Sequence, residues 1–212
     1  MKVNTSPQFI QRQLLELLGT KLAPGSVQIA LSDTLLLPNT CSDGITPAYF
    51  LHVDSKYGSL ILDGGVKVYW DRFTDTYNKM LVAAPYKTTV LKKWEVAAVC
   101  VGFAQLDSTW PKPGLLIDIS HLEPAIDAVL KIAGGPVANF LERANSTRGL
   151  LKLCEDKLEG VGTWRPTLEF ELRAKLFGTS RACESLSSWS PEESTGYERY
   201  QKQWLHDHYC VN

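Results

Sequence analysis

The sequence predicts an α+β fold. We expect a mixed or mainly antiparallel sheet from the N-terminal half, covered by helices from residues 120–158, and a further helix at the C-terminus. Strand-like segments come first and helix-like segments follow, and this order is typical of α+β folds rather than doubly wound ones. Along residues 66–71 the apolar Val66, Val68 and Trp70 alternate with polar neighbours. Such alternation indicates an antiparallel strand with one face in solvent.

The stretch from residue 114 to 158 supports the helical layer. Residues 115–119 form a short apolar run, as in a strand that is buried on both faces. Ser120 and Glu123 then have the spacing of a capping box, which predicts a helix start. Gly134-Gly135 is expected to end that helix. Because a strand buried on both faces needs cover, we expect these helices to pack on the sheet.

Further elements are predicted from periodicity and turn signals. An amphipathic helix should begin at Ser6-Pro7, since serine is a favoured N-cap and proline fits the first helical turn. Asp63-Gly64-Gly65 is expected to form a tight hairpin turn. The strands predicted in this half are residues 27–31, 48–54, 59–63 and 66–71.

Two segments have conflicting signals. Val90–Leu106 has apolar residues at helical spacing, but it is also rich in β-branched residues, and we favour a strand over Val96–Ala104. Residues 168–176 are largely helix formers, yet apolar and charged residues alternate throughout. A period of two is the pattern of a strand, so we predict a strand there.

The domain organisation predicted is a single α+β domain over residues 1–178, a Ser-rich linker or loop over 179–190 and a C-terminal helix over 191–209. Ser190-Pro191 and Glu193 specify the start of that helix well. The helix carries an aromatic stripe, with residues at steps of three and four: Tyr197, Tyr200, Trp204 and His208. We expect the stripe to dock on the same domain; the alternative is that it binds a partner or a second copy of the chain.

Composition excludes several classes of protein. With 22 basic and 23 acidic residues the formal net charge is −1, which makes nucleic-acid binding unlikely because such proteins carry a basic excess. No apolar run approaches membrane-spanning length, and the N-terminus lacks the apolar core of a signal peptide. The five cysteines are widely spaced without a C-x-x-C motif, so we expect reduced thiols in a cytoplasmic protein.

One group of residues points to metal chemistry. His52 and Asp54 lie two apart on a predicted strand and therefore project from one face, and His121 supplies a third ligand type suited to iron or zinc. These three residues resemble the H-x-D…H pattern of 2-oxoglutarate-dependent iron dioxygenases. The resemblance covers only these three residues. It implies an iron site, although His121 lies at a predicted helix start and Lys131 stands in place of the family's oxoglutarate-binding arginine.

The chain has no dinucleotide-binding glycine motif, P-loop, nucleophile elbow or zinc-protease motif. Trp110, Trp164 and Trp189 fall in predicted loops, and loop aromatics are enriched at protein interfaces. We therefore expect a non-catalytic cytoplasmic protein, without a cofactor, that binds another protein as an inhibitor, immunity or adaptor protein does. The expected binding residues are Trp110, Trp164, Trp189, Tyr197, Tyr200 and Trp204. The alternative is a metal-dependent enzyme that uses His52, Asp54 and His121.

Overall fold

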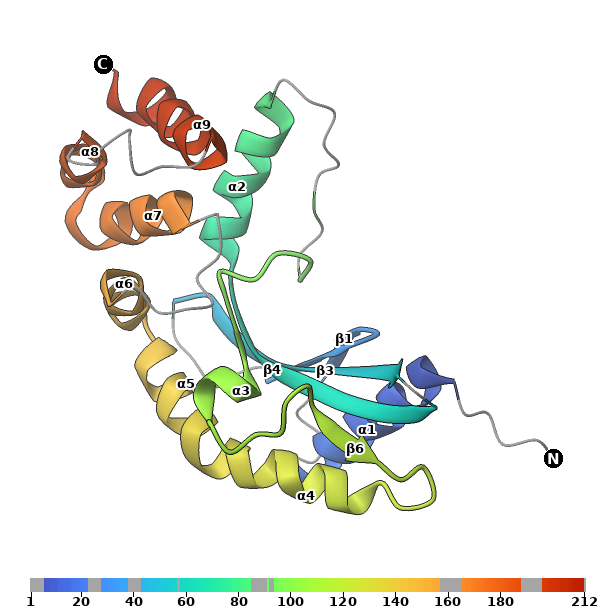
Figure 1. Cartoon of the computed structure of the whole chain (residues 1–212). Helices are drawn as coiled ribbons and strands as arrows, with labels where there is room; N and C mark the ends of the chain where they lie inside the picture. The colour runs from blue at the N-terminus through green and yellow to red at the C-terminus, as the bar shows by residue number, and fades with distance from the viewer. Residues whose placement is uncertain are drawn as a thin grey trace. The chain divides into compact units, whose positions relative to one another are not determined.

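The structure is a computed structural model that describes residues 6–22, 28–37, 43–56, 58–84, 91, 94–156, 165–187 and 196–211 (Figure 1). The chain divides into two compact units, each assembled from separate stretches of sequence. The first, here called the sheet unit, consists of Met1–Cys41, Thr46–Val68 and Cys100–Glu142. The second, the helical unit, consists of Ser42–Ile45, Tyr69–Val99 and Arg143–Asn212.

The predicted α+β class and the mainly antiparallel sheet are confirmed. The sheet has the order β1-β2-β3-β4-β5, with β6 paired to β4. Its strands are β1 (Gln28–Leu31), β2 (Thr34–Leu36), β3 (Ile45–Lys56), β4 (Ser59–Trp70), β5 (Val99–Gly102) and β6 (Leu115–Ile117). The β1/β2, β2/β3 and β4/β6 pairs are antiparallel, with Leu35 opposite Tyr49 and Ile61 opposite Leu116.

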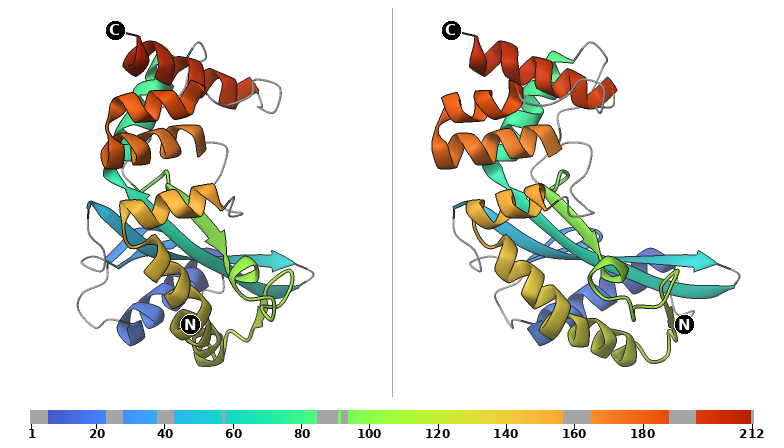
Figure 2. Two further views of the ribbon diagram at one scale, coloured as in Figure 1. Left: turned by 90° about the vertical axis from the view of Figure 1, so that its left-hand side faces the viewer. Right: turned by 60° about the vertical axis from the view of Figure 1, so that its left-hand side comes forward.

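Helices α1 (Pro7–Leu22) and α4 (Glu123–Ile132) lie side by side on one face of the sheet (Figures 1 and 2). The apolar positions of α1 recur at helical spacing, and Leu14 and Leu18 are fully buried. Gln11 is a buried polar residue on this face. Its amide donates to the Ser32 carbonyl, and its oxygen accepts from the Val53 amide, so it satisfies backbone groups of the sheet.

Three further helical segments follow α1 and the strands in this part of the sequence. They are α3 (Phe103–Leu106), the π-helical η1 (Ala133–Val137) and α5 (Ala138–Ala144). Gly134-Gly135 does not end α4 as predicted, because η1 continues it directly into α5. Pro136, which lacks an amide hydrogen, is accommodated by this wider turn.

The predicted hairpin turn at Asp63-Gly64-Gly65 is wrong, because β4 runs through these residues without a break. Both glycines are required by close packing instead. A Cβ on Gly65 would collide with the Val101 carbonyl, and a Cβ on Gly64 would collide with the Phe50 carbonyl. Adjacent backbones therefore approach β4 too closely for any side chain at these positions.

Residues 115–119 were expected to be buried on both faces, and this is also wrong. The strand there, β6, is only three residues long, and Leu116 in its centre is 69% exposed. Helix α4 begins at Glu123, and the Ser120 hydroxyl donates to the Asp118 carboxylate instead of capping the helix. Apolar composition alone does not distinguish a short exposed strand from a buried one.

The helical unit is built around α7. Its helices are α2 (Asp71–Ala83), α6 (Thr147–Glu155), α7 (Arg165–Phe177), α8 (Thr179–Ser187), α9 (Gly196–Leu205) and the π-helical η3 (His206–Cys210). Helices α2, α6, α8 and α9 all pack against α7 (Figures 1 and 2). No helix among the described residues is long and apolar enough to cross a membrane.

The predicted strand over residues 168–176 is wrong, since this segment is helix α7. Its five consecutive residues Leu168, Glu169, Phe170, Glu171 and Leu172 are all buried. Because neighbouring helices surround α7, its glutamates face protein rather than solvent. Alternating charge therefore did not mark a wet face, and the helix-forming residue types gave the correct indication.

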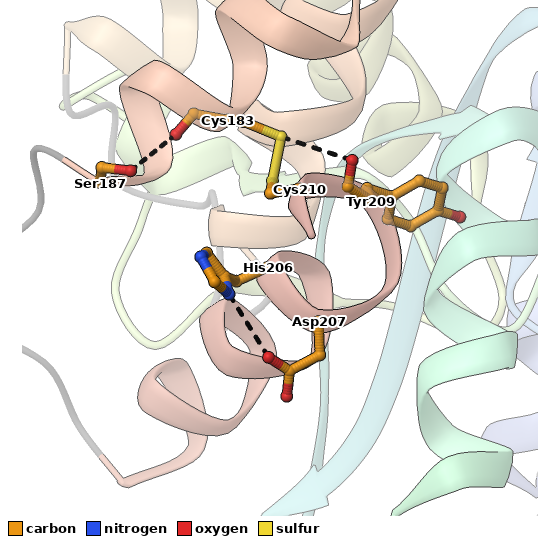
Figure 3. The surroundings of a disulfide bond; sticks show 6 residues. All are labelled: Cys183, Ser187, His206, Asp207, Tyr209 and Cys210. Atoms are coloured by element: carbon orange, nitrogen blue, oxygen red, sulfur yellow. Dashed lines mark hydrogen bonds and ion pairs between the residues drawn. A yellow bond between two sulfur atoms is a disulfide. The ribbon is translucent and has the colours of Figure 1, made fainter. Parts of the chain in front are cut away.

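The Ser-rich segment 179–190, expected to be a loop or linker, forms α8 over Thr179–Ser187. Ala182 of α8 is buried, and Cys183 forms a disulfide with Cys210 (Figure 3). Tertiary packing and this covalent link outweigh the modest helix propensity of serine. The expectation that all cysteines are reduced is therefore wrong; Cys100 and Cys154 are free, and Cys41 lies outside the described residues.

Two other predictions are met in part. Within Val96–Ala104 the strand β5 covers only Val99–Gly102, and α3 begins at once at Phe103. The C-terminal helix is present as α9 and η3 and ends at Cys210. The predicted start of that helix, at Ser190-Pro191, lies outside the described residues.

The Gly65→Ala substitution should lower the free energy of unfolding by at least about 2 kcal/mol, because the added methyl group meets backbone that cannot move aside. The matched control is Gly134→Ala, where nothing lies within 4 Å of the new Cβ and stability should be unchanged or higher. Denaturant unfolding of both variants measures the difference, and equal stabilities would contradict the close approach at β4.

Removal of the disulfide by a Cys183→Ser, Cys210→Ser double substitution should cost about 3–4 kcal/mol, since the two cysteines are 27 residues apart and the bond limits the unfolded chain. A reductant should lower the melting temperature of the natural chain and leave that of the double variant unchanged. Thiol titration in denaturant should find two more thiols after reduction than before. Equal thiol counts would show that the bond does not form.

Candidate functional site

The loop tryptophans do not form an exposed interface in the described structure. Trp110 is buried and packs against Phe103, with ring centroids 4.9 Å apart. It therefore belongs to the core of the sheet unit. Trp164 and Trp189 lie outside the described residues.

The aromatic stripe of the C-terminal helix packs on its own chain. The Tyr197 hydroxyl is 2.8 Å from the Tyr77 hydroxyl on α2, and the Tyr200 hydroxyl donates to the Met80 carbonyl at 3.1 Å. Trp204 is 7% exposed and stacks on the ring of His208, with centroids 4.2 Å apart. The stripe thus holds α9 against α2.

The residues of the alternative metal site are not brought together. His52 is exposed on β3, and Asp54 pairs with Lys56 at 3.3 Å. His121 is 3.8 Å from Asp118, and its side chain is 76% exposed. Hydrogen bonds from Ser120 lower the pKa of the Asp118 carboxyl. Among the described residues no group of three histidine, cysteine or carboxylate side chains is placed to hold a metal ion.

The free cysteines are poor nucleophiles. Burial raises the pKa of the Cys154 thiol to about 12, and burial also raises the pKa of Cys100. Since the thiolate is the reactive form, both thiols remain protonated and unreactive at neutral pH. Neither side chain is a candidate for covalent catalysis.

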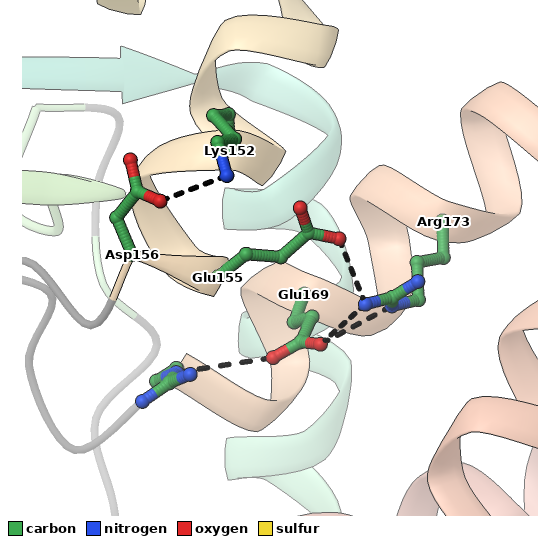
Figure 4. A network of polar contacts seen from close by, with 6 residues as sticks. Lys152, Glu155, Asp156, Glu169 and Arg173 are labelled. Atoms are coloured by element: carbon green, nitrogen blue, oxygen red, sulfur yellow. Dashed lines mark hydrogen bonds and ion pairs between the residues drawn. The ribbon is translucent and has the colours of Figure 1, made fainter.

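The buried carboxylates of the helical unit, Glu169 and Glu171, lie beside arginines, and Figure 4 shows this for Glu169 and Arg173. Glu169 binds Arg173 at 3.0 Å and lies 3.8 Å from Arg165, and Glu155 also reaches Arg173. Glu171 pairs with Arg72 and accepts from the Thr76 hydroxyl at 2.6 Å. Carboxylates held in this way stabilise the helix packing and are not available as a general acid or base.

The best candidate for a functional site is a groove on the helical unit, between α2 and the α9–η3 helix. It has a volume of about 570 Å³, which lies in the range of ligand-binding pockets. The described residues that line it are Asn78, Lys79, Val82, Ala83, Trp204, His208 and Tyr209. We call it the α2–η3 groove.

Helical spacing and the π-helical turn position these side chains. Lys79, Val82 and Ala83 are three and four residues apart, so they share one face of α2. On the other wall His208 Nδ1 is 2.8 Å from the Trp204 carbonyl oxygen. Since that oxygen only accepts, Nδ1 carries the proton and Nε2 is left for other contacts.

A ring contact and a disulfide bond hold the η3 wall of the groove. The Tyr209 ring lies 5.4 Å from Phe170 of α7, and its backbone carbonyl is 3.7 Å from the Cys183 sulfur. The next residue, Cys210, is bonded to Cys183 (Figure 3). The wall that carries His208 and Tyr209 is therefore fixed to both α7 and α8.

The groove is apolar with few polar groups. Val82, on the α2 wall of the groove, is 67% exposed. Lys79 forms no ion pair or hydrogen bond within the described part of the chain. No aspartate, glutamate, serine or cysteine is among its described lining residues.

Of the binding residues expected from the sequence, Trp204 is the one that is among the described lining residues of this groove. One signal for Val82 was present. On α2 the residues Tyr77, Met80 and Leu81 mark the buried side, and Val82 falls outside that stripe. An apolar residue outside the buried stripe of a helix is expected to be exposed. The contribution of Lys79 had no sequence signal.

The Trp204→Ala substitution should lower the free energy of unfolding by about 3–5 kcal/mol, because it removes a large buried side chain from the contact between α9 and α2. Trp204→Phe keeps a ring and should cost clearly less. His206→Ala, on the exposed side of the same segment, is the matched control and should be nearly neutral. Unchanged denaturant unfolding of Trp204→Ala would contradict the docked position of the helix.

The chain was compared with protein-family models, with curated proteins and with solved structures, and none of the three comparisons found a match. The functional argument therefore depends on the side chains of the α2–η3 groove.

Proposed function

We propose that this is a non-catalytic binding protein that holds a segment of another protein, in the manner of an inhibitor, immunity or adaptor protein. The observation that carries the proposal is the α2–η3 groove, in which a 67% exposed Val82 adjoins a largely apolar wall. Apolar surface of this kind gains free energy when a partner removes it from water.

Two further observations support binding over catalysis. The buried carboxylates are paired with arginines, and the pKa of the Cys154 thiol is raised to about 12 by burial. The metal-dependent enzyme that was the alternative has no assembled ligand set among the described residues. The partner is a different protein or a second copy of the chain, and the groove accepts an apolar segment from either.

The cytoplasmic location expected from the sequence is part of this proposal, and the Cys183–Cys210 disulfide stands against it. Cytoplasmic proteins generally keep their thiols reduced, whereas disulfides persist in oxidising compartments. Thiol trapping during cell lysis separates the two cases. Free thiols at Cys183 and Cys210 in the trapped protein would support a cytoplasmic location. An intact bond would instead indicate an oxidising compartment.

The Val82→Glu substitution should weaken partner binding at least tenfold, because it places a charge in the apolar groove. The fold should be unaffected, since Val82 is exposed. The matched control is Phe177→Glu, which also replaces an exposed apolar residue of the helical unit but lies away from the groove. Extract of the source cells is passed over the three immobilised proteins, and binding of each retained protein is then measured by calorimetry after purification.

The proposal expects a partner that binds the natural chain and Phe177→Glu with equal affinity, and Val82→Glu at least tenfold more weakly. Sedimentation of the purified chain tests the case in which the partner is a second copy. A partner that binds Val82→Glu normally would exclude the groove as the binding site. The absence of any partner and of self-association would contradict the proposed function itself.

A further inference from the structure

The η3 turn has little apolar burial to hold it in the helical unit. None of its residues, His206–Cys210, is buried, whereas α9 directly before it buries Gln201, Trp204 and Leu205. Removal of apolar surface from water is the main gain in free energy when a helix docks, and short helices gain little stability by themselves. The position of η3 therefore depends on specific links to its neighbours.

Those links converge on the disulfide (Figure 3). Cys210 of η3 is bonded to Cys183 of α8, and the Tyr209 carbonyl oxygen lies 3.7 Å from the Cys183 sulfur. The Tyr209 ring packs against Phe170 of α7, with ring centroids 5.4 Å apart. The side-chain hydrogen bonds of η3 within the described part of the chain run back to α9 or to a neighbour in η3. The disulfide is therefore the strongest link from η3 to α7 and α8.

The bond is open to thiol–disulfide exchange. Cys183 and Cys210 are both partly exposed, and access is one condition for attack by a thiolate. The two free cysteines of the described chain compete poorly for the pair. Burial raises the pKa of the Cys154 thiol to about 12 and also raises the pKa of Cys100. Among the described cysteines, reduction and reoxidation therefore act on the same two residues.

The η3 turn supplies one wall of the α2–η3 groove. His208 and Tyr209 line the groove, and both rings lie against Trp204 of α9, with centroids 4.2 Å and 6.0 Å from it. Helix α9 has a separate link to α7, because the Thr167 hydroxyl donates to Gln201 at 2.7 Å. Loss of η3 would therefore remove this wall and leave α9 in place.

We propose that the Cys183–Cys210 disulfide is a redox switch, which forms the α2–η3 groove when oxidised and releases its η3 wall when reduced. This inference rests on the proposed function, because it concerns the regulation of the same groove. Once the bond is broken, η3 has little buried surface to keep it docked, and it unwinds from the end of α9.

The reductant is a dithiol. One of its thiolates attacks a sulfur of the bond, which gives a mixed disulfide and frees the other cysteine of the pair as a thiolate. The second thiolate of the reductant then displaces the remaining cysteine. In all, two electrons and two protons pass to the chain, so Cys183 and Cys210 end as thiols and the dithiol ends as a disulfide.

Hydrogen exchange of the natural chain, with and without dithiothreitol, tests the release of η3. After reduction the amides of residues 206–210 should exchange at least tenfold faster, while those of α7 keep their protection. A bond that merely limits the unfolded chain would speed exchange in η3 no more than in α7. That result, or unchanged exchange throughout, would overturn the switch.

The histidine ring signals in NMR report on the groove wall. The His208 ring stacks on Trp204, so the ring current of the indole displaces its proton signals from those of a free histidine. Reduction should return these signals, assigned from His208→Gln, to the free positions, and oxidised glutathione should restore the stacked ones. His52, exposed on β3, is the internal control and should not change. Stacked His208 signals in the reduced chain would contradict the proposal.

Two variants complete the test. The Cys183→Ser, Cys210→Ser double variant should show the released η3 with or without dithiothreitol. Cys100→Ser is the matched control, because it removes a free cysteine outside the bond, and it should switch as the natural chain does. A double variant whose η3 stays protected, or a Cys100→Ser variant that no longer switches, would contradict the assignment to this pair.

The outcomes separate this inference from the proposed function. If η3 stays in place after reduction, the switch is wrong, and the groove remains a candidate binding site. If η3 is released, a partner of the oxidised chain should bind the reduced chain at least tenfold more weakly, and equal affinity would show that the bond does not regulate binding. If η3 is released but neither state has a partner or self-associates, the proposed function is wrong, and the release of η3 stands.

Discussion

The helical unit depends on the burial of α7 together with its two glutamates. Glu171 has a side chain only 3% exposed, and it is held by Arg72 and Thr76 of α2. Glu169 binds Arg173 of its own helix at 3.0 Å (Figure 4), and Arg165 lies 3.8 Å away. An unpaired buried charge is strongly unfavourable, so these partners must be in place for α7 to occupy the centre of the unit. The pairing therefore sets the position of α2 relative to α7.

The α2–η3 groove follows from that arrangement. Helix α9 packs on α7, where Gln201 accepts from the Thr167 hydroxyl at 2.7 Å, and on α2, through the Tyr197 and Tyr200 hydroxyls. The groove lies beside the last turn of α2, at Val82 and Ala83. The π-helical turn of η3 and the disulfide then set the far wall with His208 and Tyr209. A groove with fixed walls loses little conformational entropy when it is filled.

The sequence correctly predicted the elements that bury one apolar face and expose the other, because such an element has a regular spacing of apolar residues. Helix α1 and the C-terminal helix each carry one apolar face, and a local period is enough to identify that face. The order of these elements along the chain also determined the α+β class. In the aromatic stripe of α9, Trp204 is 7% exposed, and the Tyr197 and Tyr200 hydroxyls contact α2.

Only the tertiary structure decided which surfaces each element meets. The alternation of apolar residues and glutamates in α7 predicted a strand with one face in solvent. That prediction failed because Glu171 is buried against Arg72, a residue far away in the sequence. The Gly64-Gly65 pair predicted a turn, since glycines are common in turns. The backbones that actually require these glycines belong to other strands and are not visible in the local sequence. The bond between Cys183 and Cys210 and the groove lined by Lys79, Val82 and Trp204 join segments far apart in the chain. Local periodicity shows which face of a segment is apolar. It does not show which distant segment that face meets, so a site made by distant segments can be found only in the folded structure.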